Sequence, residues 1–128
     1  MKALPSLSLI DLRQLHEPIM AVTAVGRLMR VHVASSFLAR SIGLLNRGEL
    51  GDDEGLLFVP GGSVHTLGMR FAIDVVFLSA SVAVLKVATN VRPWRFALAP
   101  PQTRYVLEIR ANRSIECGIV PGRSIEFA

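Results

Sequence analysis

The stretch of residues 64–78 most constrains how this chain can fold. It ends in the apolar run 73–78, which carries a single carboxylate, Asp74, between Ile73 and Val75. A buried carboxylate without a partner is costly, so we expect Asp74 to bond to a nearby group. His65 and Arg70 are the nearest candidates along the chain. The stretch therefore predicts a strand that carries a polar anchor.

Short apolar segments separated by glycine and proline turns make up most of the remaining sequence. Residues 28–34 and 105–110 alternate between two faces, which is typical of strands. Residues 55–59 are apolar throughout, which favours a central strand. Residues 82–87 are expected to return antiparallel to residues 73–78. Two further strands are predicted at 21–25 and 124–127.

Helical signals are few. Ser35 and Ser36 offer an N-cap for a short helix near residues 36–46, whose apolar side chains fall at near-helical spacing. Ser114 is expected to cap one helical turn through Glu116, ended by Gly118. Many short strands with one short α-helix predict a mainly β protein, a compact antiparallel β-barrel or β-sandwich.

A chain of 128 residues has the length of one domain. We expect residues 20–128 to form this β-rich domain and residues 1–19 to be a flexible N-terminal arm, because they show no convincing apolar stripe and Pro18 ends any helix. Asp11, Arg13 and Glu17 interrupt the arm, which matches neither a signal peptide nor a transmembrane span. We therefore expect a cytoplasmic protein, while export stays open.

Cysteine and histidine are sparse. Cys117 is the only cysteine, so no disulfide can form within the chain, and it is interpreted as a buried small hydrophobe. His16, His32 and His65 lie far apart and show no zinc-ligand spacing. No phosphate-binding or dinucleotide-binding loop is present in the sequence. We expect neither a metal site nor a cofactor.

The net charge of +4 comes from an excess of arginine. Seven basic residues lie between Lys86 and Arg123, against two acids, Glu108 and Glu116. A coding bias towards arginine is the favoured explanation of the overall excess. The local excess is a mild pointer to an anion-binding face, with a small anionic ligand or a protein as partner. Nucleic acid is the weaker alternative, because no recognised nucleic-acid module is visible. A monomer or weak dimer is expected.

The ordered set of motifs resembles the domain-of-unknown-function 192 family, which consists of small bacterial and archaeal proteins. The resemblance covers about residues 28–127 and rests on segments 55–58, 64–66, 69–71, 73–78, 92–95, 106–108 and 121–122, together with Gly118. It implies a compact, mainly β fold, often described as a barrel, with no agreed activity. Two departures stand out: members often carry a cysteine shortly before the histidine, where this chain has residues 60–63, and Arg123 replaces a frequent aspartate.

Seven residues form the predicted ligand-binding site, with no catalytic residue assigned: His65, Arg70, Asp74, Arg92, Trp94, Arg95 and Glu108. In one interpretation they line a concave site, where arginine forks hold an anionic group and Trp94 stacks on it or covers it. In the other, Arg70 pairs with Asp74, Glu108 pairs with an arginine of the 92–95 turn, and Trp94 packs in the core or at its rim. The structural interpretation is favoured for Asp74, Glu108 and Trp94, and the two are balanced for His65.

Two classes of function remain open. A binding or accessory domain for a small anionic or sugar-like ligand, or for a partner peptide, is preferred because no complete catalytic set is visible. The alternative is a small hydrolase or lyase-like enzyme that uses His65 as general base, oriented by Asp74 or Glu108. Nucleic-acid binding through the basic C-terminal half is a weaker alternative.

Overall fold

The structure is a computed structural model that describes residues 19–22, 26, 28–34 and 50–127. The strands in this part of the chain are β1 (Ile19–Val22), β2 (Leu28–Ala34), β3 (Glu54–Phe58), β4 (Val64–His65), β5 (Ile73–Leu78), β6 (Val84–Val91), β7 (Phe96–Ala97), β8 (Tyr105–Arg110) and β9 (Glu126–Phe127). A short helix, α2 (Arg113–Glu116), follows β8. None of the helices in these ranges is long and apolar enough to cross a membrane.

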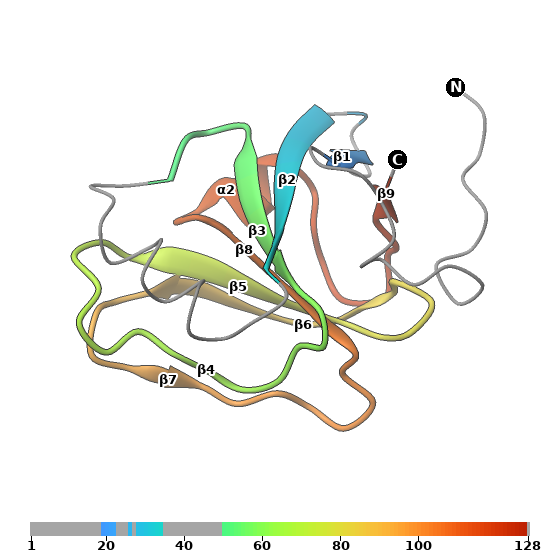
Figure 1. Ribbon diagram of the computed structural model, residues 1–128. Coiled ribbons are helices and arrows are strands. Elements are labelled where there is room, and N and C mark those ends of the chain that lie inside the picture. Colours follow the sequence, from blue (N-terminus) through green and yellow to red (C-terminus); the bar gives the residue numbers. More distant parts are fainter. Residues whose placement is uncertain (1–18, 23–25, 27, 35–49, 128) are drawn as a thin grey trace.

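Seven strands form one sheet in the order β6-β5-β8-β3-β2-β1-β9. Neighbouring strands run antiparallel, except that β2 and β3 are parallel. The sheet curls into a half-barrel (Figure 1). Strands β4 and β7 form a separate two-stranded sheet, which Figure 1 shows as a layer beside β5 and β6. The predicted mainly β fold, a barrel or sandwich, is confirmed.

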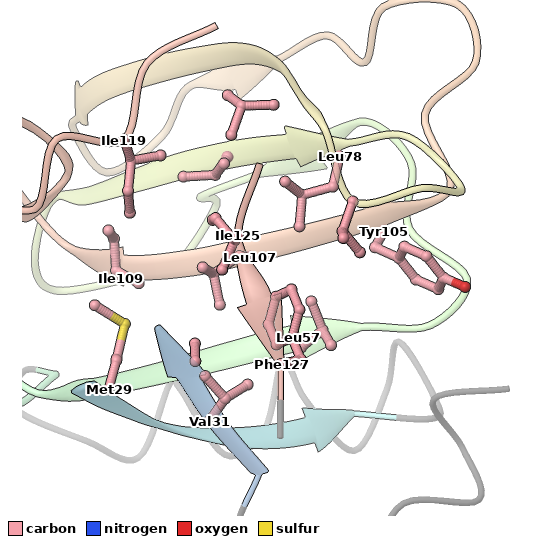
Figure 2. Close-up of a cluster of buried hydrophobic side chains, with 14 of the residues drawn as sticks. Met29, Val31, Leu57, Leu78, Tyr105, Leu107, Ile109, Ile119, Ile125 and Phe127 are labelled. Atoms are coloured by element: carbon pink, nitrogen blue, oxygen red, sulfur yellow. The ribbon is translucent and has the colours of Figure 1, made fainter. Parts of the chain in front are cut away.

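Two apolar cores lie on opposite faces of the central strands, because successive residues of a strand point to opposite faces. The first core contains Ala21, Met29, Val31, Leu57, Val59, Val76, Leu78, Val82, Val84, Tyr105, Leu107, Ile109, Cys117, Ile119, Ile125 and Phe127. Figure 2 shows its labelled side chains from β2, β3 and β8 pointing into one cluster. The second core contains Leu50, Phe58, Val64, Met69, Ile73, Val75, Phe77, Ala97 and Val106.

The small β4–β7 layer covers the second core. Val64 and Ala97, which face each other in the register of β4 and β7, both belong to that core. Met69, in the turn after β4, packs in the same cluster. The layer is therefore fixed to the sheet by its inward side chains, while Phe96 on its other side is exposed and His65 is half-buried.

Gly61 anchors the loop that leads from β3 into this layer. Its N–H donates to the carbonyl of Arg104 at 2.8 Å. A Cβ at this position would lie 2.5 Å from the backbone nitrogen of Val106. The loop therefore approaches β8 so closely that only glycine fits at residue 61.

The strand bounds of 28–34, 73–78 and 105–110 agree with the sequence predictions, and β3 lies in the middle of the sheet as expected. The predicted strand 21–25 occurs at Ile19–Val22, and the predicted strand 82–87 at Val84–Val91. The expected Ser114 cap is wrong: the residue before the helix is Asn112, which makes no side-chain cap hydrogen bond. The predicted helix near 36–46 and residues 1–18 of the predicted arm lie outside the described residues.

Candidate functional site

Asp74 is fully buried in β5, and its carboxylate is a hub of hydrogen bonds. Oδ1 accepts from the backbone N–H of Asn90 at 2.8 Å and of Asn112 at 2.9 Å. Oδ2 accepts from the backbone N–H of Ser114 at 3.0 Å and from the Ser114 hydroxyl. Asp74 thus joins β5 to the end of β6 and to the start of α2. Its role in this structure is to hold three segments together.

The predicted partners of Asp74 are wrong. Among the described residues, no ion pair joins Asp74 to Arg70, which is exposed. Asp74 lies opposite Ile109 in the register of β5 and β8, and Ile109 belongs to the first core. His65 lies in the layer over the second core, on the other face of the sheet. Sequence proximity suggested contacts that the alternation of β5 prevents.

Glu108 points the opposite way. It lies opposite Val75 of the second core and is buried, with Oε2 shielded from solvent. Glu108 is therefore on the face that the β4–β7 layer covers. Within the described ranges no ion pair joins it to Arg92 or Arg95, so the predicted pairing with the 92–95 turn is wrong.

Arg113 is a buried cation that the sequence analysis missed. Its Nε donates to the carbonyl of Asp52 at 2.7 Å, and its guanidinium forms ion pairs with Asp53 at 2.9 Å and with Glu116. Burial alone would lower the pKa of Arg113, but the hydrogen bonds to Glu116 and Asp53 outweigh it and the pKa is raised. This network attaches the 51–54 loop to α2.

Thr66 organises the β4–β7 layer. Its hydroxyl donates to the carbonyl of Arg92 at 2.6 Å and accepts from the backbone N–H of Arg95 at 2.9 Å. Its backbone N–H donates to the carbonyl of Arg95 at 2.9 Å, and its carbonyl accepts from the N–H of Trp94 at 3.0 Å. One buried threonine therefore fixes the whole 92–95 turn.

Trp94 is held at the tip of this turn with a positive φ of 65°. Trp94 is 64% exposed, so of the predicted packing in the core or at its rim, packing in the core is wrong. Arg92 and Arg95 on either side of it are exposed as well, and Arg95 Nη1 donates to the Trp94 carbonyl at 3.2 Å. The turn therefore exposes an indole ring and two guanidinium groups.

Two more apolar side chains continue from Trp94. Phe96 and Leu98 are 69% and 68% exposed, while Ala97 between them is buried. The rings of His65 and Phe96 meet edge to face, with centroids 6.5 Å apart. Lys86 Nζ donates to the carbonyl of Leu98 at 3.0 Å, which brings a further cation to the end of the row. We call Trp94, Phe96 and Leu98 the apolar strip.

The segment of the chain that contains the strip is rich in exposed cations. Residues 60–107 carry five basic side chains, all exposed: Arg70, Lys86, Arg92, Arg95 and Arg104. The only acid in this range is Asp74, which is buried and turned towards the first core. Within residues 60–107, which the structure describes in full, these exposed cations are accompanied by no exposed carboxylate.

The structure therefore divides the seven predicted site residues. His65, Arg92, Trp94 and Arg95 come together on the β4–β7 layer, and Glu108 lies on the face beneath it. Asp74 belongs to a structural hub on the opposite face. Arg70 is exposed near the end of the turn that follows β4. Thr66 was not predicted as a site residue, although its position next to His65 in a strand-like motif was visible.

The sequence matches a protein family whose description names no activity. The model of the domain-of-unknown-function 192 family, described as "Uncharacterized ACR", matches residues 20–127. The UPF0127 protein of Pyrococcus furiosus is 35% identical over 91 residues, which cover 65% of this chain and 75% of the relative.

Two solved structures share the fold. A protein of unknown function from Novosphingobium aromaticivorans has a TM-score of 0.74 and 28% identity, over 85% of this chain and 83% of its own. A protein from Sinorhizobium meliloti, described as a candidate transcription regulator, has a TM-score of 0.69 and 24% identity, over 85% of this chain and 91% of its own. The latter likeness shows the fold alone.

Proposed function

The chain belongs to the domain-of-unknown-function 192 family, and because the description of that family names no activity, we propose a function from the site itself: a binding domain that holds an anionic partner on its β4–β7 layer. The observation that carries this proposal is the conformation and exposure of Trp94. The surrounding charge supports it. A cytoplasmic location remains part of the proposal.

A tryptophan in the left-handed region is unusual. Such a backbone conformation costs a non-glycine residue about 1–3 kcal/mol, and it persists only where surrounding contacts hold it. Here the bonds to Thr66 supply those contacts. They place the indole in water, where it contributes no core packing. Strain that is maintained to expose a large aromatic ring supports a role in binding.

The cations beside Trp94 favour an anionic partner over a neutral sugar. Arginine binds carboxylate and phosphate groups through two parallel hydrogen bonds. Arg92, Arg95 and Arg70 are exposed, and among the described residues none of the three pairs with an acid. Their guanidinium groups are therefore available for a ligand.

The enzyme alternative is weakened by the alternation of β5. A general base at His65 needs a carboxylate that orients its ring. Asp74 faces the other side of the sheet and already accepts four hydrogen bonds. Only Glu108 remains as a candidate for that role.

Intrinsic fluorescence tests the proposal directly, because Trp94 is the only tryptophan of the chain. We would titrate the protein with inorganic phosphate, polyglutamate, a single-stranded oligonucleotide and anionic lipid vesicles. We expect at least one of these anions to change the Trp94 emission, and the response to weaken as salt is added. An oligonucleotide as the only effective anion would favour the nucleic-acid alternative.

A pair of matched variants makes the test specific. The double substitution Arg92→Gln and Arg95→Gln should abolish the response. The control, Arg30→Gln and Arg123→Gln, removes the same charge from exposed positions outside residues 60–107 and should keep it. Equal responses in the two variants, or no response to any anion, would contradict the proposed function.

A further inference from the structure

A site that binds only an anion does not need the exposed apolar side chains of the strip. Phosphate or carboxylate groups can be held by the arginines alone, yet Phe96 and Leu98 expose about as large a fraction of their surface as Trp94. A partner that matches both features must offer negative charge at its surface and an apolar interior directly behind it. An anionic lipid bilayer has this layered chemistry.

We propose that the β4–β7 layer docks on the surface of an anionic membrane. This inference rests on the proposed function and names its partner. Trp94, Phe96 and Leu98 enter the boundary between headgroups and acyl chains, while Arg92 and Arg95 bind headgroup phosphates. Trp is the residue that prefers this boundary, because its ring is apolar and its N–H remains hydrogen-bonded.

The shape of the strip suits a shallow insertion. Its three side chains stand two residues apart along residues 94–98, which lead from the turn through β7 and span at most about 13 Å. Buried Ala97 and Val64 hold that segment against the second core. Lys86, bonded to the Leu98 carbonyl, adds a cation at the far end. The strip can therefore enter a lipid surface while the layer beneath it stays packed.

Other partners match only part of this surface. A single-stranded nucleic acid would use the charge and could stack on Trp94 and Phe96, but it offers nothing to Leu98. A second copy of the chain would bring two sets of exposed arginines together. An acidic peptide would use the arginines and would need apolar side chains of its own for the strip. The anionic lipid surface accounts for both the exposed arginines and the whole apolar strip.

Vesicle binding tests the inference. We would mix the protein with vesicles of phosphatidylcholine, with and without phosphatidylglycerol, and follow co-sedimentation and the emission of Trp94. We expect binding and a blue shift of the emission only with the anionic vesicles. Arg92→Gln with Arg95→Gln should weaken partitioning about 30-fold, since each basic residue near such a surface contributes a factor of about five. The Arg30→Gln and Arg123→Gln control should retain most of the binding.

The strip has its own matched control. Phe96→Ser with Leu98→Ser should weaken partitioning about tenfold or more, through the loss of apolar surface that enters the lipid. Ile115→Ser with Val120→Ser removes exposed apolar side chains outside the strip, 69% and 43% exposed, and should leave it unchanged. Lipids brominated in their acyl chains should quench Trp94 in the unmodified protein, which tests insertion even where a variant fails to fold.

The outcomes separate the two proposals. Absence of vesicle binding, or an equal effect of the strip variant and its control, overturns membrane docking. Binding without quenching by brominated lipids overturns it as well. If polyglutamate or the oligonucleotide still changes the Trp94 emission in those cases, the proposed function stands without the membrane. If no anion changes it, both proposals fall.

Discussion

Ser114 donates two hydrogen bonds to Asp74, one from its backbone N–H at 3.0 Å and one from its hydroxyl, although the two residues are forty positions apart in the chain. Together with the amides of Asn90 and Asn112, they make the Asp74 carboxylate a structural joint. A carboxylate in this setting is expected to matter for stability and not for ligand binding.

Asp74→Ala should therefore lower the free energy of unfolding by about 2–4 kcal/mol, because it leaves buried donors without an acceptor. Urea unfolding measures the effect. Ser114→Ala, which removes only the hydroxyl, should cost about 1 kcal/mol. An unchanged urea midpoint for Asp74→Ala would show that the hub contributes no stability.

Thr66→Val should loosen the 92–95 turn without a large change of side-chain volume. The substitution removes the hydroxyl that bonds to Arg92 and Arg95, and we expect a loss of about 1–2 kcal/mol and a shift of the Trp94 emission. Thr103→Val is the control, since the Thr103 hydroxyl bonds to the Pro100 carbonyl at 2.7 Å in another turn. Identical emission spectra of Thr66→Val and the unmodified protein would show that the turn does not depend on this hydroxyl.

Gly61→Ala should destabilise the protein by about 1–3 kcal/mol or more, because the new methyl group meets the backbone of Val106 and forces the loop away from β8. Gly62→Ala is the matched comparison, since a Cβ there has no neighbour within 4 Å. Thermal unfolding of the two variants measures the difference. Equal melting temperatures would mean that the loop can move away from β8 at no cost.

Arg113→Met keeps the apolar stem and removes the buried charge. Its partners Asp53 and Glu116 are exposed and regain water, so we expect a loss of about 1–3 kcal/mol, smaller than for a pair with two buried partners. The pKa of Arg113 is raised in the folded state. Its contribution to stability is therefore complete at pH values below the pKa of the unfolded state, and it is lost only as the pH rises through the pKa of the folded state. The difference in unfolding free energy between Arg113→Met and the unmodified protein should thus be the same at neutral and at moderately alkaline pH. A difference that becomes smaller at alkaline pH would contradict this prediction.

The strands that sequence reasoning located best are those whose local pattern decides their structure. Residues 73–78 are apolar apart from Asp74, and residues 105–110 alternate between the two cores. Local patterns do not specify which strands become neighbours. The parallel pairing of β2 with β3 and the separate β4–β7 layer depend on contacts between distant segments, and neither was predicted.

The candidate site, like the strands, was predicted only as far as local sequence patterns allow. Arginines around a tryptophan in a proline turn indicated a binding surface, and the structure brings Arg92, Trp94 and Arg95 together with His65 on the β4–β7 layer. The partners of Asp74 are backbone amides of residues 90, 112 and 114, which carry no signal in their side-chain identity. The exposure of Trp94 follows from a positive φ that a tryptophan rarely adopts.

The position of β8 between β3 and β5 determines how the chain can fold as it is synthesised. The middle of the sheet is built from residues 105–110, which leave the ribosome after β3 and β5 are complete. Until then each of those two strands has an open edge facing the missing strand, and Asp74 lacks the amides of Asn112 and Ser114. The sheet therefore closes only after β8 is made, and a chain that stops before residue 105 exposes two strand edges that favour aggregation.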